Sequence, residues 1–198
     1  MSNYAERLAY WFLRLNGFFI LENYVIDSYN SKAEHDLLAV RLPYAREAIS
    51  GVDIEHHALF GEGELAVCRK SICGLVVQVK GGGQLGRRQY PGNAFRRERI
   101  EHAIRRVGLF SDPEEKEAFD ALTPSPTYKT NSAVFAKLFM AERVPDRPES
   151  YISISLRDVD EYVVTRLRQA TIKQSHWHYF HDPFAQYIIL RNGRRARG

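Results

Sequence analysis

The chain has 198 residues, of which 44% are hydrophobic and 26% are charged. This composition is typical of one globular domain with a sizeable core, and it excludes disordered and fibrous chains. A formal net charge of +4 and a pI of about 9.1 allow nucleic acid as a partner without requiring it. No apolar run is long enough to span a bilayer and no secretory leader is visible, so we expect a cytoplasmic protein without a membrane partner.

The first part of the chain predicts one helix followed by three strands. Apolar residues recur at helical spacing over residues 4–15, and the helix ends at the Asn-Gly pair that follows. Aromatic and β-branched residues predict strands over 18–26 and 36–42, separated by turn-forming residues at 27–32. The Leu-Val-Val run predicts a third, buried strand over 74–80.

Residues 44–72 have no clear periodicity, and we interpret them as an insertion between the second and third strands. The two cysteines, Cys68 and Cys73, flank the end of this segment at a spacing that fits no CxxC or zinc pattern. We therefore expect both cysteines to be reduced thiols.

The second part of the chain predicts a basic helix over 96–110, an acidic helix over 113–122, and strands over 133–141 and 151–156. Ser155 and Asp158 predict the start of a further helix that runs to about residue 172. Residues 173–198 form an aromatic and basic C-terminal extension. The order predicts an α/β fold of one domain, with a central mixed sheet flanked by helices.

Polar residues interrupt two of the predicted strands at positions that could converge. Gln78 and Lys80 stand two residues apart on the third strand and so point to the same side. Asp36 begins the preceding predicted strand, which places an acid, an amide and an ammonium group at one end of the sheet if the strands pair. One carboxylate, one carbonyl oxygen and a substrate phosphate can suffice for Mg²⁺, so this trio suits phosphodiester hydrolysis. A neighbouring lysine can orient the attacking water or stabilise transition-state charge.

These residues resemble the motif of the PD-(D/E)XK nuclease superfamily, whose members share the restriction-endonuclease-like fold. The resemblance rests on Asp36 in EHDLLAVR, Gln78 and Lys80 in VVQVK, and Glu6 in YAERLAYW. The QxK form is closest to the Mrr-type branch, in which glutamine replaces the third-strand acid. His35 stands where the family pattern has proline, and the link between Asp36 and Gln78 is longer than the family pattern implies.

The resemblance implies an αβββαβ core and a Mg²⁺- or Mn²⁺-dependent nuclease that acts on DNA rather than RNA. Asp36 would bind the metal, Gln78 would offer its carbonyl oxygen, and Glu6 would be a further metal ligand. Lys80 would position or activate the attacking water. A chain of this size would need a second copy of itself or a separate targeting protein to select its substrate.

Each residue of the motif also has an ordinary structural interpretation. Glu6 follows Asn3 at capping-box spacing and could serve only to cap its helix. Asp36 could be an acid at a strand edge, and Gln78 and Lys80 could mark the strand's exit into solvent. Glu34 and Glu22 are weaker substitutes for the second acid.

The segment between residues 84 and 106 is rich in arginine, with seven arginines against two glutamates. A basic helix beside a nuclease centre would neutralise phosphates and make binding salt-dependent. The alternative is a solvated helix face whose arginines pair with Glu98 and Glu101. The residues predicted to bind nucleic acid are Arg87, Arg88, Arg96, Arg97 and Arg99.

A second cluster of possible ligands lies near the C-terminus, in HWHYFHDP. His176, His178, His181 and Asp182 could bind a transition metal, although their spacing matches no familiar zinc pattern and aromatic packing explains the segment as well. Two other functions stay open beside the nuclease. The fold could be a catalytically decayed module that binds nucleic acid or protein, or the motif could be a chance match with a small-molecule role for the aromatic C-terminal part.

Overall fold

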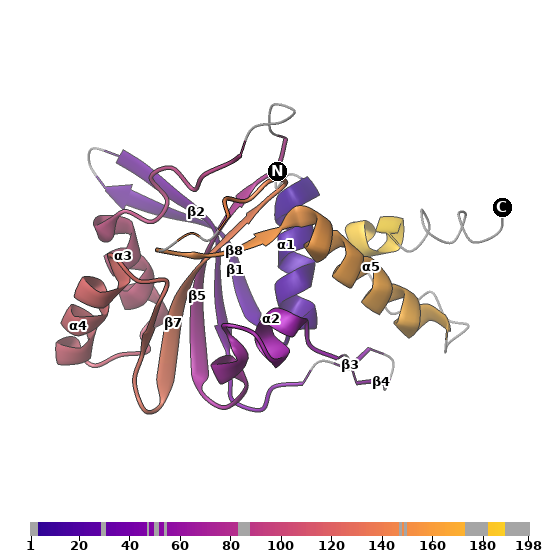
Figure 1. The fold of residues 1–198 in the computed structure, drawn as a ribbon, viewed down its shortest axis with the longest axis horizontal. Coiled ribbons are helices and arrows are strands. Elements are labelled where there is room, and N and C mark those ends of the chain that lie inside the picture. The colour runs from indigo at the N-terminus through magenta and orange to yellow at the C-terminus, as the bar shows by residue number, and fades with distance from the viewer. Residues whose placement is uncertain are drawn as a thin grey trace.

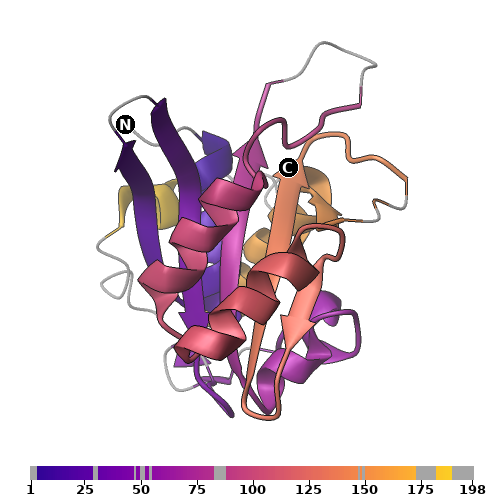
Figure 2. The same ribbon diagram turned by 90° about the vertical axis from the view of Figure 1, so that its left-hand side faces the viewer.

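A computed structural model of the chain describes residues 4–28, 31–46, 48–49, 52–53, 55–82, 88–146, 148, 150–172 and 182–188. Within these residues, a mixed sheet of six strands has helices packed on both of its faces (Figures 1 and 2). The α/β class and the mixed sheet flanked by helices, both expected from the sequence, are confirmed. In the same residues, no helix is both long enough and apolar enough to cross a bilayer.

The sheet has the strand order β1-β2-β5-β7-β6, and β8 pairs with the second half of β7. β1 (Phe19–Ser28), β2 (Ser31–Arg41) and β5 (Ile72–Lys80) form an antiparallel meander. β7 (Ala133–Ala141) lies parallel to β5, which requires the chain to cross over between them. Two short strands pair with β7: β6 (Thr127–Lys129) is antiparallel to it and β8 (Ile152–Ser155) is parallel.

The crossover from β5 to β7 contains two helices that cover one face of the sheet (Figure 2). α3 (Arg97–Val107) ends at Gly108, whose φ of 66° is the left-handed conformation that favours glycine. α4 (Asp112–Leu122) begins with a capping box in which Ser111 and Glu114 satisfy each other's backbone N–H groups. Both helices pack on a cluster of apolar side chains that includes Leu38, Val76, Ile100, Phe119 and Phe135.

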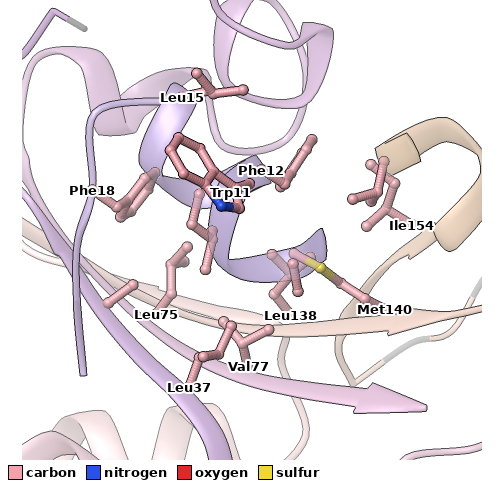
Figure 3. Packing of buried hydrophobic residues seen from close by; sticks show 14 of the residues in the cluster. Trp11, Phe12, Leu15, Phe18, Leu37, Leu75, Val77, Leu138, Met140 and Ile154 are labelled. Carbon is pink, nitrogen blue, oxygen red and sulfur yellow. The ribbon is translucent and has the colours of Figure 1, made fainter. Parts of the chain in front are cut away.

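The other face of the sheet is covered by α1 (Tyr4–Leu15) and α5 (Leu156–Ile172). α1 places a broad apolar stripe against the sheet, because its buried residues recur at helical spacing. The hydroxyl of Ser155 accepts the backbone N–H of Asp158 at 3.1 Å and caps α5, as the sequence predicts. Figure 3 shows this larger core, in which α1 supplies Trp11, Phe12 and Leu15 and the strands supply Leu37, Leu75, Val77, Leu138 and Met140.

The hairpin between β1 and β2 is longer than the sequence predicts. β2 begins at Ser31, five positions before Asp36, and Asp27 pairs with Lys32 inside the ladder. The predicted turn over 27–32 was therefore wrong in extent. The local preference of these polar residues is for turns. In the hairpin, however, cross-strand pairing satisfies their backbone N–H and C=O groups equally well.

Residues 44–72 contain four short elements between β2 and β5. These are β3 (Ala48–Ile49), β4 (Val52–Asp53), α2 (Ala58–Gly61) and the 3₁₀ helix η1 (Ala66–Arg69). Buried Cys68 and Cys73 form a disulfide, so the expectation of reduced thiols was wrong. η1 turns the chain back into β5 and brings the two Cα atoms within 5.1 Å, a separation that a disulfide can bridge.

Candidate functional site

The candidate site lies where β2 and β5 separate. Their ladder ends at the pair Leu37 and Val77, so Asp36 and Gln78 are the next residues along the two strands. The remaining residues of β2 continue to pair with β1. Asp36 and Gln78 therefore stand opposite each other at the fork, with no ladder hydrogen bond between them to constrain their backbones.

A direct contact joins these two side chains. Oδ2 of Asp36 accepts hydrogen bonds from Nε2 of Gln78 and from the backbone N–H of Val79, each at 2.5 Å. The carboxylate thus takes over a backbone donor that the strand ladder no longer satisfies. Asp36 is held in position by two donors on β5, and it lies within the strand rather than at its start.

Lys80 shares the face of the sheet that carries Asp36 and Gln78. Side chains alternate along a strand, and Val76 and Leu38 pack under α3 and α4, so the three polar residues face the same side. The Lys80 ammonium lies beside the turn at Gly92, where a Cβ atom would be 3.7 Å from Nζ. The structure thus places all three predicted residues at one end of the sheet and on one face.

Glu6 approaches the same end of β5 from the other face. It lies half-buried in the first turn of α1, a helix that packs with Val77 and Val79 on the opposite side of the sheet. A Cβ atom on Gly81 would come within 2.8 Å of the Ala5 methyl, so this turn of α1 sits against the end of β5. Asn3, which could cap the helix, lies outside the described residues.

The weaker alternatives for a second acid are engaged elsewhere or lie outside the described side chains. Glu22 pairs with Arg7 at 3.0 Å. Arg7 also pairs with Asp182, which accepts the Trp11 indole N–H at 3.2 Å and a backbone N–H of the helix at 183–188. Asp182 therefore anchors the C-terminal helix to α1. The other members of its motif (His176, His178 and His181) and the side chain of Glu34 lie outside the described part of the chain.

Glu142 is an acid at this end of the sheet that sequence reasoning missed. It follows β7 directly, beside Gly81 in the parallel register. Its Oε1 accepts the backbone N–H of Gly82 at 3.0 Å, and its own N–H donates to the side chain of Gln89 at 3.0 Å. An acid at the end of a buried strand is the signal that could have identified it. A cavity of about 580 Å³ opens there, lined by Tyr4, Gly82, Glu142, Arg157 and Asp160 among others.

The arginines predicted to bind nucleic acid are partly compensated by acids. Arg88 pairs with Asp146. Arg97 bonds to Glu101 at 3.0 Å and to Asp120 at 2.9 Å, and these hydrogen bonds raise the pKa of Arg97. These pairs agree with the solvated-face interpretation of the segment.

The other arginines of the set are placed differently. Arg96 is exposed at the N-cap of α3, and Arg99 is half-buried in the first turn of the same helix. Arg87 lies outside the described residues. Exposed Arg96, at the N-cap of α3, therefore offers positive charge at the start of this helix.

The donors at the fork suit a hard divalent cation. Carboxylate and amide oxygens are ligands that Mg²⁺ accepts, with water and substrate phosphate completing the shell. The Gln78 amide donates its N–H to Asp36, and within the described residues its oxygen accepts no hydrogen bond. In the same residues, no group of three or more His, Cys, Asp or Glu side chains could hold a metal.

Scans against protein-family models, curated proteins and solved structures find no match for this chain.

Proposed function

We propose that the chain is a Mg²⁺- or Mn²⁺-dependent nuclease of the restriction-endonuclease-like fold that hydrolyses phosphodiester bonds in DNA. The observation that carries this proposal is the contact between Asp36 and Gln78 at the fork of β2 and β5, with Lys80 on the same face. The order of one helix, an antiparallel β1-β2-β5 meander and a helical crossover to parallel β7 agrees with the core that the resemblance implies.

Asp36 and the Gln78 amide oxygen would hold the cation, which when bound would polarise the phosphate that is to be cleaved. Lys80 would donate hydrogen bonds to the attacking water or to a phosphate oxygen and would balance the charge that develops in the transition state. The N–H groups of Gln78 and Val79 that donate to Asp36 keep its carboxylate oriented without assistance from substrate. Glu6, from the neighbouring turn of α1, is the candidate for an outer ligand.

DNA would approach along the first turn of α3. Arg96 and Arg99 lie there, and a helix N-terminus favours phosphate through its free N–H groups. Since Arg88 and Arg97 already pair with acids, we expect them to contribute less to DNA affinity. Substrate choice would come from a second copy of the chain or from a targeting protein.

The test is cleavage of plasmid, linear duplex and single-stranded DNA with Mg²⁺ or Mn²⁺, using the wild type, Asp36→Asn and Lys80→Ala. Lys116→Ala is the matched control, because Lys116 is an exposed lysine on α4. We expect both site variants to lose cleavage and the control to keep it. Undiminished cleavage by Lys80→Ala would exclude the proposed mechanism.

A second function is favoured by one detail of the same contact. The oxygen Oδ2 of Asp36 already accepts two hydrogen bonds, an arrangement that a purely structural acid would also make. In that case the chain would be a decayed module that binds DNA without cutting it. Salt-dependent DNA binding by the wild type, with no cleavage and no effect of Mg²⁺ on affinity, would favour this module over the enzyme.

A further inference from the structure

A second polar cavity lies at the opposite end of the sheet. Its volume is about 540 Å³, and it opens between the end of β2 and the segment that leads into β5. Figure 1 shows β3, β4 and α2 at this end, away from the start of α1. The length of β5, roughly 30 Å at about 3.3 Å per residue, separates it from Lys80. We call it the basic pocket, and its polar and aromatic lining consists of Arg41, Tyr44, Arg46, His56, Arg69 and Lys70.

The basic pocket concentrates positive charge, and the carboxylates closest to its lining (Asp53, Glu55 and Glu62) line the adjoining cavity that shares Arg46 and Arg69 with it. Four of its lining residues are arginine or lysine, and no carboxylate lines it among the described residues. Arg69 and Lys70 are exposed, and neither side chain makes an ion pair in the described part of the chain. The bridge from Arg46 to Asp53 is long, at 3.7 Å, and exposed, so it neutralises little. Clustered cations in a concave site attract anions.

Arg41 places one of these charges on the buried side of the pocket. Its side chain is about 1% exposed. Among the described residues, its guanidinium donates to the backbone carbonyls of Asn16, Ala45 and Cys68 and to the ring of His56. These carbonyls satisfy its N–H groups but leave its net charge in place. Burial and the nearby Arg69 lower the pKa of Arg41, as expected for a cation that lacks a counter-ion.

His56, another residue of the lining, carries a hydrogen-bond donor that is itself buried beneath the surface of the pocket. Its Nε2 lies 3.3 Å from the Arg41 guanidinium, and since arginine can only donate, Nε2 accepts and the ring hydrogen is on Nδ1. Nδ1 is buried and, within the described residues, has no hydrogen-bond partner. Burial, Arg41, Arg69 and Arg46 all lower the pKa of His56, which keeps the ring neutral. A buried donor of this kind calls for an acceptor, and the described residues supply none.

Tyr44 adds an aromatic surface at the edge of the pocket. The side chain is 76% exposed, and Tyr44 is the one non-glycine residue in the described part of the chain with positive φ, at 59°. A hydrogen bond from its N–H to the Arg69 carbonyl, at 2.9 Å, holds this conformation. Such strain is retained where the residue has a use. An exposed aromatic ring beside a cluster of cations is an arrangement on which a base can stack.

We propose that the basic pocket binds a 5′-phosphorylated nucleotide, with the phosphate held by Arg69 and Lys70 and the base stacked on Tyr44. Arg41 provides positive charge on the buried side of the pocket. The cavity volume lies in the range of small-ligand sites. The ligand is either a free nucleotide or the phosphorylated end of a nucleic-acid strand, since both offer the same chemistry. The site shares no residue with the fork of β2 and β5 and does not depend on nuclease activity.

The experiment is titration calorimetry in EDTA, with adenosine 5′-monophosphate, adenosine, inorganic phosphate, and single-stranded oligonucleotides carrying either a 5′-phosphate or a 5′-hydroxyl. We expect the monophosphate to bind more tightly than adenosine and than inorganic phosphate. The double variant Arg69→Gln, Lys70→Gln should weaken that binding at least tenfold. Tyr44→Gly, which suits a left-handed backbone, should weaken it about tenfold by removing the stacking surface.

Lys116→Gln is the control that should bind like the wild type, and thermal unfolding verifies that every variant is folded. Monophosphate binding without a 5′-phosphate preference among oligonucleotides identifies the free nucleotide as ligand. A clear 5′-phosphate preference identifies the strand end. The proposal is overturned if neither adenosine 5′-monophosphate nor the 5′-phosphorylated oligonucleotide binds. It is also overturned if inorganic phosphate binds as tightly as the monophosphate, or if the double variant retains full affinity.

Discussion

At one end of the sheet, an acid and an amide are joined by short hydrogen bonds where two strands separate. At the other end, four cations line a cavity in which no carboxylate is found among the described residues. The first end suits a cation and the phosphate that it would activate, and the second suits an anion that is only bound. Under the two proposals, one sheet would hold two kinds of phosphate chemistry far enough apart that each could be altered alone.

The largest expected effect is that mutations at the two ends of the sheet impair different activities. Asp36→Asn should lower metal-dependent cleavage by about 10²- to 10³-fold, the size of effect seen when a transition-state contact is removed. It should leave nucleotide affinity in EDTA unchanged. The double variant Arg69→Gln, Lys70→Gln should instead weaken nucleotide binding and leave cleavage unchanged. Cleavage rates and calorimetry on both variants measure this. A single variant that lost both activities while remaining folded would mean that the two ends form one site.

Lys137 provides a second buried cation with which to compare Arg41. Its side chain is about 1% exposed under α4, and its ammonium donates to the Leu122 carbonyl at the C-terminal end of that helix. Burial lowers the pKa of Lys137 from 10.5 to about 8. The helix end offers partial negative charge, so this cation needs no anion.

The lowered pKa of Lys137 makes stability depend on pH in a defined direction. Between about pH 8 and 10.5 the unfolded chain retains the lysine proton while the folded protein has lost it, so the contribution of Lys137 to the free energy of unfolding rises with pH. The cost of burying the charge is fully present below pH 8 and corresponds to about 3 kcal/mol. Denaturant unfolding measures the free energy of unfolding of the wild type and of Lys137→Met. The difference between these two free energies should shrink as the pH rises from about 8 to 10.5. A difference that stays constant with pH would contradict the prediction.

Gly81→Ala tests how closely α1 is tied to the fork. The new methyl would come within 2.8 Å of Ala5, so the first turn of α1 must shift. We expect a loss of about 1–3 kcal/mol in unfolding free energy, the usual cost of overpacking. Cleavage should fall as well if Glu6 assists there. Adding Ala5→Gly removes the opposing methyl and should restore most of the loss, and failure of this rescue in thermal unfolding would count against the packing argument.

The smallest expected effect is that of Tyr44→Gly on stability. Glycine adopts the left-handed conformation without strain but loses more backbone freedom on folding, so the two terms nearly cancel. Unfolding free energy should change by less than about 1 kcal/mol while nucleotide affinity falls. Denaturant unfolding measures the first quantity. A large loss of stability would show that the ring packs on the protein and that its strained conformation has a structural cause.

Local features of the sequence predicted much of the architecture. Helix α1 and strand β7 have the bounds that their apolar patterns predict, and Ser155 caps α5 as expected. Such features depend on residues within one or two turns of each other, which is why periodicity and capping rules detect them. Strand β6 was missed, because three residues carry too little pattern to stand out from a loop.

The two ends of the sheet differ in how much of each was visible in the sequence. Asp36, Gln78 and Lys80 drew attention as polar residues that interrupt apolar strands. The basic pocket did not, because Arg41 and Arg46 stand more than twenty positions before Arg69 and Lys70, and no periodicity connects them. The contact of Glu142 with Gly82 was missed for the same reason, because it joins residues sixty positions apart. The disulfide of Cys68 and Cys73 is local, and it was missed because their spacing fits no familiar cysteine pattern.

The sequence by itself determined the α/β class, the amphipathic faces of the helices and the alternation that puts Gln78 and Lys80 on one side of their strand. These follow from local backbone geometry and the burial of apolar side chains. Only the tertiary structure decided that β2 leaves β5 at Asp36, and that cations from both ends of a thirty-residue segment surround one cavity. Strand register and loop closure are long-range outcomes, selected by the packing of the whole core, and no short stretch of residues encodes them.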